Sequence, residues 1–80
     1  MNNELKIFAE RLRILRIEKG WSQEELATKM GCAKSLISYY ENCKREPVFT
    51  TILKLSRLFD EDPGYLMGES HQRRLKKMSS

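Results

Sequence analysis

The sequence predicts an all-α fold of five short helices around one core. Apolar residues recur at spacings of three and four, the period of an amphipathic helix. Capping residues and glycines separate these stretches, and no segment has the pattern of a strand. The helices are expected at residues 4–19, 23–30, 34–42, 48–59 and 63–67. Residues 1–68 are expected to form the domain, followed by a basic, polar tail over residues 69–80.

Local capping signals bound the first three helices. The first helix is expected to end at Gly20. Ser22 is a good N-cap for the second helix, and Glu25 three residues later completes a capping box. Gly31 is expected to end the second helix and to allow a tight turn into the third.

The last two helices follow a polar loop that ends at Pro47, a residue that cannot continue a helix. Asp62 and Pro63 form an N-cap and first-turn pair for the fifth helix, which Gly68 should end. The expected core comprises Phe8, Leu12, Leu15, Leu26, Met30, Ile37, Leu53 and Phe59. The residues expected at its edges are Trp21, Tyr40, Tyr65 and Leu66.

The net charge of +4 is concentrated at one end of the chain. All 11 acidic residues lie within residues 1–69, together with 11 of the 15 basic ones, so this part is neutral. The excess comes from Arg73, Arg74, Lys76 and Lys77. A binding face in the domain must therefore arise from the sorting of charges, while the tail suits a phosphate backbone, an acidic partner or solvent.

Several classes of protein are disfavoured. The one histidine, His71, lies in the tail without a nucleophile–base pair, so neither an enzyme nor a metal or cofactor site is expected. About 11 residues of helix at about 1.5 Å each separate Cys32 from Cys43, too far for a disulfide, so two reduced thiols with Cys32 buried are expected. No apolar run approaches about 20 residues and no signal peptide is evident, which predicts a cytoplasmic protein.

Residues 23–41 have the pattern of two short helices packed across a tight turn. The inward positions are apolar, namely Leu26, Met30, Ile37 and Tyr40, and Ala27 is small where the helices cross. The outward positions of the second of these helices can all form hydrogen bonds: Lys34, Ser35, Ser38 and Tyr39. This combination is typical of a helix-turn-helix that reads DNA.

At this point the sequence resembles a known family, the phage-repressor-like or Xre-type helix-turn-helix regulators of bacteria and their phages. The similarity covers about residues 7–68. The matching elements are Arg11-Leu12-Arg13-x-Leu15-Arg16, Gly20-Trp21-Ser22-Gln23-Glu24-Glu25-Leu26-Ala27, Gly31, Ile37-Ser38, Glu41-Asn42, Lys44-Arg45-Glu46-Pro47, Leu55 and Tyr65-Leu66-Met67-Gly68. The resemblance implies a compact five-helix lambda-repressor-like DNA-binding domain, with the helix-turn-helix at its second and third helices.

The resemblance also implies roles for individual residues. The positions that face base edges in the major groove correspond to Lys34, Ser35, Ser38 and Tyr39. Those that contact DNA phosphates correspond to Gln23, Asn42, Lys44 and Arg45. Arg16 and Glu41 correspond to a salt bridge between the first and third helices. Helix N-termini favour phosphate and a lysine can donate to guanine, but each of these residues can also be an ordinary solvated surface residue.

Two residues depart from the family pattern, and one group of residues is unusual. Ala33 replaces the serine or threonine N-cap of the third helix, which weakens that helix by about 1 kcal/mol. Cys43 replaces a glycine, so a left-handed backbone there would store roughly 1 kcal/mol or more of strain. Ile7, Ile14 and Ile17 lie outside the core stripe of the first helix and suit a second subunit or the tail.

The leading hypothesis is a homodimeric, sequence-specific transcriptional regulator, acting as a repressor, that reads a palindromic operator in double-stranded DNA through the major groove. Two recognition helices related by a two-fold axis read half-sites about 34 Å apart. The alternatives are a restriction–modification controller that contacts RNA polymerase, an autoregulating antitoxin that binds a toxin, and a protein-interaction module without DNA binding. The sequence leaves open the operator, the sign of regulation and the dimer face, for which the fifth helix also qualifies.

Overall fold

The computed structural model describes residues 3–69, and the secondary structure in this range is entirely helical. The five helices are α1 (Asn3–Glu18), α2 (Gln23–Met30), α3 (Lys34–Glu41), α4 (Phe49–Phe59) and α5 (Pro63–Met67). The prediction of an all-α fold with five helices is confirmed, and α2 and α5 have the expected bounds. Helix α3 ends one residue earlier than expected, because Asn42 leaves the helical conformation with φ −104° and ψ 15°.

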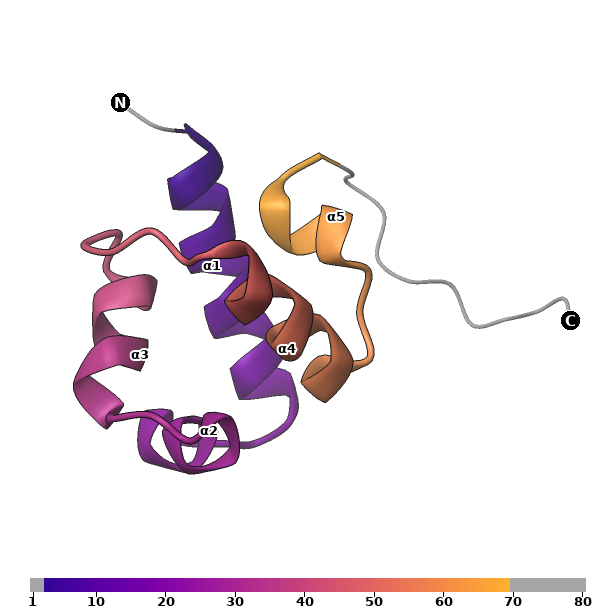
Figure 1. The fold of residues 1–80 in the computed structure, drawn as a ribbon. Coiled ribbons are helices and arrows are strands. Elements are labelled where there is room, and N and C mark those ends of the chain that lie inside the picture. Colours follow the sequence, from indigo (N-terminus) through magenta and orange to yellow (C-terminus); the bar gives the residue numbers. More distant parts are fainter. Residues whose placement is uncertain (1–2, 70–80) are drawn as a thin grey trace, which may run out of the picture.

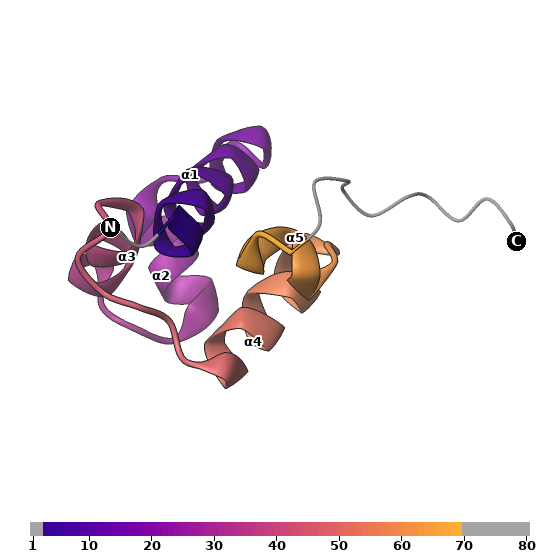
Figure 2. The same cartoon turned by 90° about the horizontal axis from the view of Figure 1, so that it is seen from above.

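Helix α1 runs through the centre of the fold. It packs against α3 and α5, while α2 packs against α3 and α4 packs against α5. Figure 1 shows α2 and α3 grouped on one side of the molecule and α4 and α5 on the other. Figure 2 shows the same division from above, with α1 along one edge of the molecule. The outward side of α3 is left without a covering helix.

The core draws buried side chains from all five helices. Its members are Phe8, Leu12, Leu15, Leu26, Ala27, Met30, Ile37, Tyr40, Ile52, Leu55, Phe59, Tyr65 and Leu66. The expectation that Tyr40, Tyr65 and Leu66 lie at the edges was wrong, because all three are buried. Trp21 does lie at the edge, half-buried, with its ring centroid 5.5 Å from that of Phe59.

The expected register of α4 was wrong at Leu53. This residue is only half-buried, whereas Ile52 and Leu55 are buried. Ile52, Leu55 and Phe59 follow each other at spacings of three and four, so they share one stripe of the helix. Leu53 is rotated about 100° from Ile52 and therefore lies beside this stripe.

The predicted capping signals are confirmed. At the start of α2, the Ser22 Oγ accepts from the Glu25 N–H at 3.0 Å, and the Glu25 Oε1 accepts from the Ser22 N–H at 2.7 Å. At the start of α5, the Asp62 carboxylate accepts from the Gly64 N–H at 3.1 Å. These bonds satisfy N–H groups that have no partner within the helix itself.

Both cysteines are free, but Cys32 is half-buried rather than buried. Partial burial raises the pKa of the Cys32 thiol, an effect that the positive charge of Lys54 opposes. Within residues 3–69, no helix combines the length and the apolar character needed to cross a membrane.

Candidate nucleic-acid interface

A tight turn at residues 31–33 joins α2 to α3. Gly31 adopts the left-handed conformation with φ 74°, which costs a residue without a Cβ little. The Cys32 N–H then donates to the Ala27 carbonyl at 3.0 Å and closes the end of α2. Ala27 and Ile37 are buried, so the two helices pack directly against each other. The position of α3 is therefore fixed by the turn and by this packing.

The inward and outward sides of α3 differ as expected. Tyr40 points inward, and its ring meets that of Phe8 edge-on at 5.7 Å. Lys34 and Ser35 are exposed on the outward side, Tyr39 is 47% exposed, and Ser38 is half-buried. The four residues proposed to read bases thus belong to the side of α3 that the domain leaves open.

The first turn of α3 is well suited to an anion. Ala33 has an extended backbone and provides no side-chain hydrogen bond to cap the helix, and the first turn contains no acidic residue. Uncapped N–H groups at a helix start carry partial positive charge. Together with the Lys34 ammonium group they form a local positive region that favours a phosphate.

Arg16 and Glu41 form the expected ion pair between α1 and α3. The Arg16 Nε donates to Glu41 Oε2 at 2.7 Å, and Nη2 donates to Glu41 Oε1 at 3.0 Å. The Gln23 Nε2 donates to the same Oε1 at 3.1 Å, and the Arg16 Nη1 donates to the Trp21 carbonyl at 2.8 Å. The hydrogen bonds to Glu41 raise the pKa of Arg16. One network therefore joins α1, the α1–α2 loop, α2 and α3.

The network with Glu41 uses part of the hydrogen-bonding capacity of the Gln23 side chain. One hydrogen of its amide group is directed at Glu41, which orients the side chain at the N-terminus of α2. A primary amide has a second hydrogen, which is the donor that a phosphate contact requires. The contact with Glu41 therefore uses one of the two amide donors of Gln23.

The end of α3 involves two of the other expected contact residues. The Asn42 Nδ2 donates to the Ser38 carbonyl at 2.9 Å and to the Ser38 Oγ at 3.2 Å. Asn42 therefore has its amide donors directed at Ser38, and a phosphate contact from this amide requires the side chain to rotate. Cys43 follows with φ 59°, the left-handed conformation whose strain the sequence led us to expect.

Basic side chains predominate on the exposed surface of α3, although residues 3–69 as a whole carry no net charge. Glu41 is the only acidic residue in α3, and its side chain is 4% exposed because Arg16 covers it. Lys34 at one end of the helix and Lys44 and Arg45 in the following loop are exposed. The exposed surface of α3 and of the loop start is therefore basic.

Three basic residues have structural roles that sequence reasoning missed. The Lys54 Nζ donates to the Met30 carbonyl at 2.8 Å, which stabilises the C-terminus of α2. Arg11 lies 4.2 Å from the ring centroid of Tyr65 and donates to its carbonyl at 2.6 Å. Lys29 lies 4.7 Å from the Trp21 ring. The Lys54 and Arg11 contacts join residues far apart in the chain, so no local pattern signals them.

Comparisons with known proteins agree with this geometry. A helix-turn-helix family model matches residues 12–66. The transcriptional regulator ImmR of Bacillus subtilis is 37% identical over 60 residues, which are 75% of this chain and 47% of ImmR. SinR of the same organism is 36% identical over 67 residues, which are 82% of this chain and 60% of SinR. The chain thus spans about half to three fifths of the length of these relatives.

A solved structure extends the comparison. The restriction–modification controller protein C.AhdI from Aeromonas hydrophila is 38% identical and superposes with a TM-score of 0.73. The superposition covers 81% of this chain and 98% of the C.AhdI chain. This chain therefore shares its fold with a solved restriction–modification controller protein.

Proposed function

The chain belongs to the Xre-type helix-turn-helix family of DNA-binding transcriptional regulators, and on this basis we propose that it represses transcription by binding a palindromic operator as a homodimer. The family supplies the class of function. The operator symmetry, the dimer and the direction of regulation are the proposed parts.

The observation that carries the proposal is the open, basic outward side of α3. Its four candidate readers are not needed for the core, and the one acidic side chain of the helix is held by Arg16. A helix with such a face fits the major groove, which is wide enough to admit an α-helix. Specificity then comes from the side chains that reach base edges.

The proposed contacts divide by chemistry. Lys34 donates to O6 and N7 of a guanine, a contact worth about 1–3 kcal/mol of discrimination. Ser35 and Ser38 bond to base edges, and Tyr39 contacts a thymine methyl group or a phosphate. The phosphate contacts that set the register come from Gln23, Asn42, Lys44 and Arg45.

Homodimerisation needs an exposed apolar face. Tyr65 and Leu66 are buried, so α5 offers little of the surface that the sequence suggested. Ile7 is half-buried, since its side chain lies against Gly68. Among residues 3–69, two exposed pairs remain, Ile14 and Ile17 at 46% and 56%, and Val48 and Phe49 at 63% and 65%. We expect one of these pairs to form the dimer interface, and sedimentation of the Ile17→Glu and Phe49→Glu variants distinguishes them.

The test is a binding titration over a range of salt concentrations with DNA from upstream of the protein's own gene. Lys34→Ala is compared with wild type and with Arg57→Ala, which removes an exposed charge at the end of α4 instead. We expect Lys34→Ala to lose about 1–3 kcal/mol and to relax the preferred base at one position in each half-site. We expect Arg57→Ala to bind like wild type.

Two results would contradict the proposal. If both variants and wild type bind all sequences equally and weakly, the upstream DNA is not an operator. If selection from random DNA then also yields no preferred site, the fold serves a protein partner instead. Binding of a non-palindromic site by a monomer would overturn the homodimer alone.

The restriction–modification controller is the second candidate, because the controller protein C.AhdI is 38% identical and superposes with a TM-score of 0.73. In that reading, Glu24 faces RNA polymerase, since the Glu25 carboxylate is engaged in the capping box of α2. An autoregulating antitoxin is the remaining reading. A neighbouring restriction–modification operon or toxin gene distinguishes these two.

A further inference from the structure

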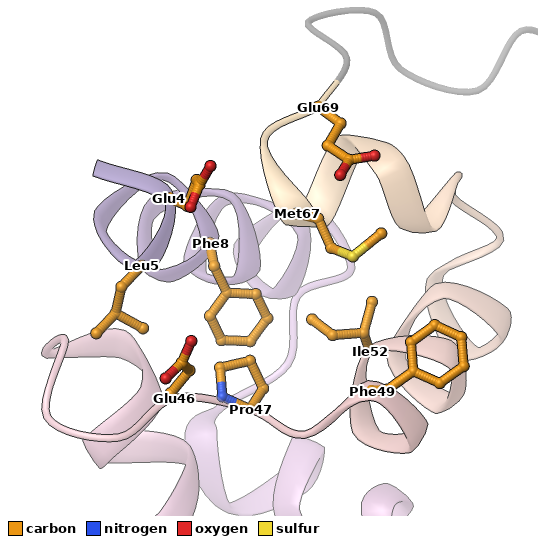
Figure 3. A pocket seen from close by; sticks show the side chains of 9 residues that line it. All are labelled: Glu4, Leu5, Phe8, Glu46, Pro47, Phe49, Ile52, Met67 and Glu69. Carbon is orange, nitrogen blue, oxygen red and sulfur yellow. The ribbon is translucent and has the colours of Figure 1, made fainter. Parts of the chain in front are cut away.

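A pocket of about 280 Å³ lies on the domain away from the proposed reading residues. It is formed by the start of α1, the loop before α4, the start of α4 and the end of α5 (Figure 3). Its apolar lining consists of Leu5, Phe8, Pro47, Phe49, Ile52 and Met67. Phe8 and Ile52 are buried, whereas Phe49 is 65% exposed, so the apolar surface continues from the interior to the outside.

Three carboxylates surround this apolar surface. Glu4, Glu46 and Glu69 line the pocket from three separate segments, and all three are exposed. Figure 3 shows them around the apolar side chains rather than among them. Within residues 3–69, none of these carboxylates has a cation as a partner. The pocket therefore combines an apolar interior with an acidic rim, for which an apolar side chain flanked by bases is the complementary ligand.

The rim argues against a second copy of the domain placed symmetrically over the pocket. An isologous interface sets the same patch opposite itself, so one acidic rim would approach the other. Like charges in close apposition are unfavourable at an interface. A basic occupant instead brings opposite charge to the rim.

The chain carries such an occupant directly after the pocket. The sequence Arg73-Arg74-Leu75-Lys76-Lys77 places one apolar side chain between two pairs of bases, and these four bases are the whole net charge of the chain. Glu69 itself lines the pocket, and Leu75 follows six residues later. An extended chain spans at most about 3.3–3.6 Å per residue, so the six residues from Glu69 to Leu75 give a reach of up to about 20 Å, which is enough to return to the pocket.

We propose that the 73–77 segment of the same chain docks in this pocket, with Leu75 against the apolar lining and the flanking bases on the acidic rim. The docked segment covers part of Phe49 and of the apolar lining. The proposal rests on charge and shape at the pocket and does not depend on DNA binding.

The test is NMR spectroscopy on the full chain. In wild type, the amide shifts of residues 73–77 should differ from those of a free peptide of residues 70–80. The double variant Glu46→Gln/Glu69→Gln should move these shifts toward the free-peptide values. The matched control, Glu24→Gln, removes an exposed charge on α2 and should leave them unchanged.

A reciprocal measurement follows the pocket side. Leu75→Ser should shift the methyl signals of Leu5, Ile52 and Met67, whereas Arg13→Ser, an exposed change on α1, should not. Salt at about 1 M should release the segment, because it reduces the Debye length to about 3 Å.

Two outcomes would overturn the proposal. Free-peptide shifts for residues 73–77 in wild type, with no response to the rim variant, would show that the segment does not dock. Docking that disappears on dilution, together with slower diffusion at high concentration, would show that the segment belongs to another copy. Unchanged methyl signals of the buried Leu12 and Leu26 check that each variant keeps its fold.

Discussion

Replacing Glu41 by methionine should strongly destabilise the domain, although the residue lies on the helix proposed to read DNA. The substitution keeps the length of the side chain but removes the carboxylate that accepts from Arg16 and Gln23. The guanidinium group of Arg16 keeps only its bond to the Trp21 carbonyl. A mostly buried positive charge is then left without its counter-ion.

The magnitude follows from burial. Removing one partner of a buried pair costs about 3–5 kcal/mol. The Arg16 side chain is 13% exposed and therefore partly solvated, so we expect the lower end, about 3 kcal/mol. At about 4–8 °C per kcal/mol for a domain of this size, the midpoint of thermal unfolding should fall by about 12–24 °C.

Circular dichroism during thermal and urea unfolding measures this loss, with Glu24→Met as the control because Glu24 is an exposed acid in the same motif. The double variant Arg16→Met/Glu41→Met removes both charges and should be more stable than Glu41→Met alone. A loss below about 1 kcal/mol for Glu41→Met, the range of exposed pairs, would refute the reasoning.

Four smaller tests concern the ends of α3 and the two thiols. Ala33→Ser places an N-cap on an already extended backbone and should stabilise the domain by about 1 kcal/mol in urea unfolding; no gain would mean that the first turn is satisfied otherwise. Cys43→Gly removes the strain of a left-handed backbone and should stabilise the domain. The expected net gain is about 0.5–1 kcal/mol, because the greater chain entropy of glycine in the unfolded state offsets part of the effect. A loss of stability would show that the Cys43 side chain makes favourable packing contacts. Iodoacetamide should modify the exposed Cys43 before Cys32, as peptide mass spectrometry would show. Burial raises the pKa of the Cys32 thiol in the folded protein, so the thiol of the unfolded chain ionises at lower pH. The free energy of unfolding should therefore fall as the pH rises above about 8.5. The fall should be shallower in the Cys32→Ala variant, which lacks this thiol.

Features set by neighbouring residues could be predicted from the sequence. The capping box of Ser22 and Glu25, the left-handed Gly31 and the Asp62–Pro63 start of α5 depend on contacts within a few residues. The alternation of inward Tyr40 and outward Tyr39 likewise follows from helical phase alone. These features place the helix-turn-helix and its candidate readers before any tertiary contact is known.

The tertiary structure decided which faces of these helices are covered. Leu53 and Ile52 are equally apolar in the sequence, and only the packing of α4 on the rest of the domain buries Ile52 and leaves Leu53 at the side. The bond of Lys54 to the Met30 carbonyl also joins residues 24 positions apart, and no local rule anticipates it.

The acidic rim of the pocket is another feature that only the tertiary structure reveals. Glu4, Glu46 and Glu69 are unremarkable surface acids in the sequence, and folding brings them around one apolar surface. The sequence by itself determined the helices, their caps and the outward residues of α3, because these depend on local geometry. Only the packing of distant segments determined the core register, the contacts of Trp21 and Gln23 with the Arg16–Glu41 pair, and the pocket, because chain folding sets the distances between these segments.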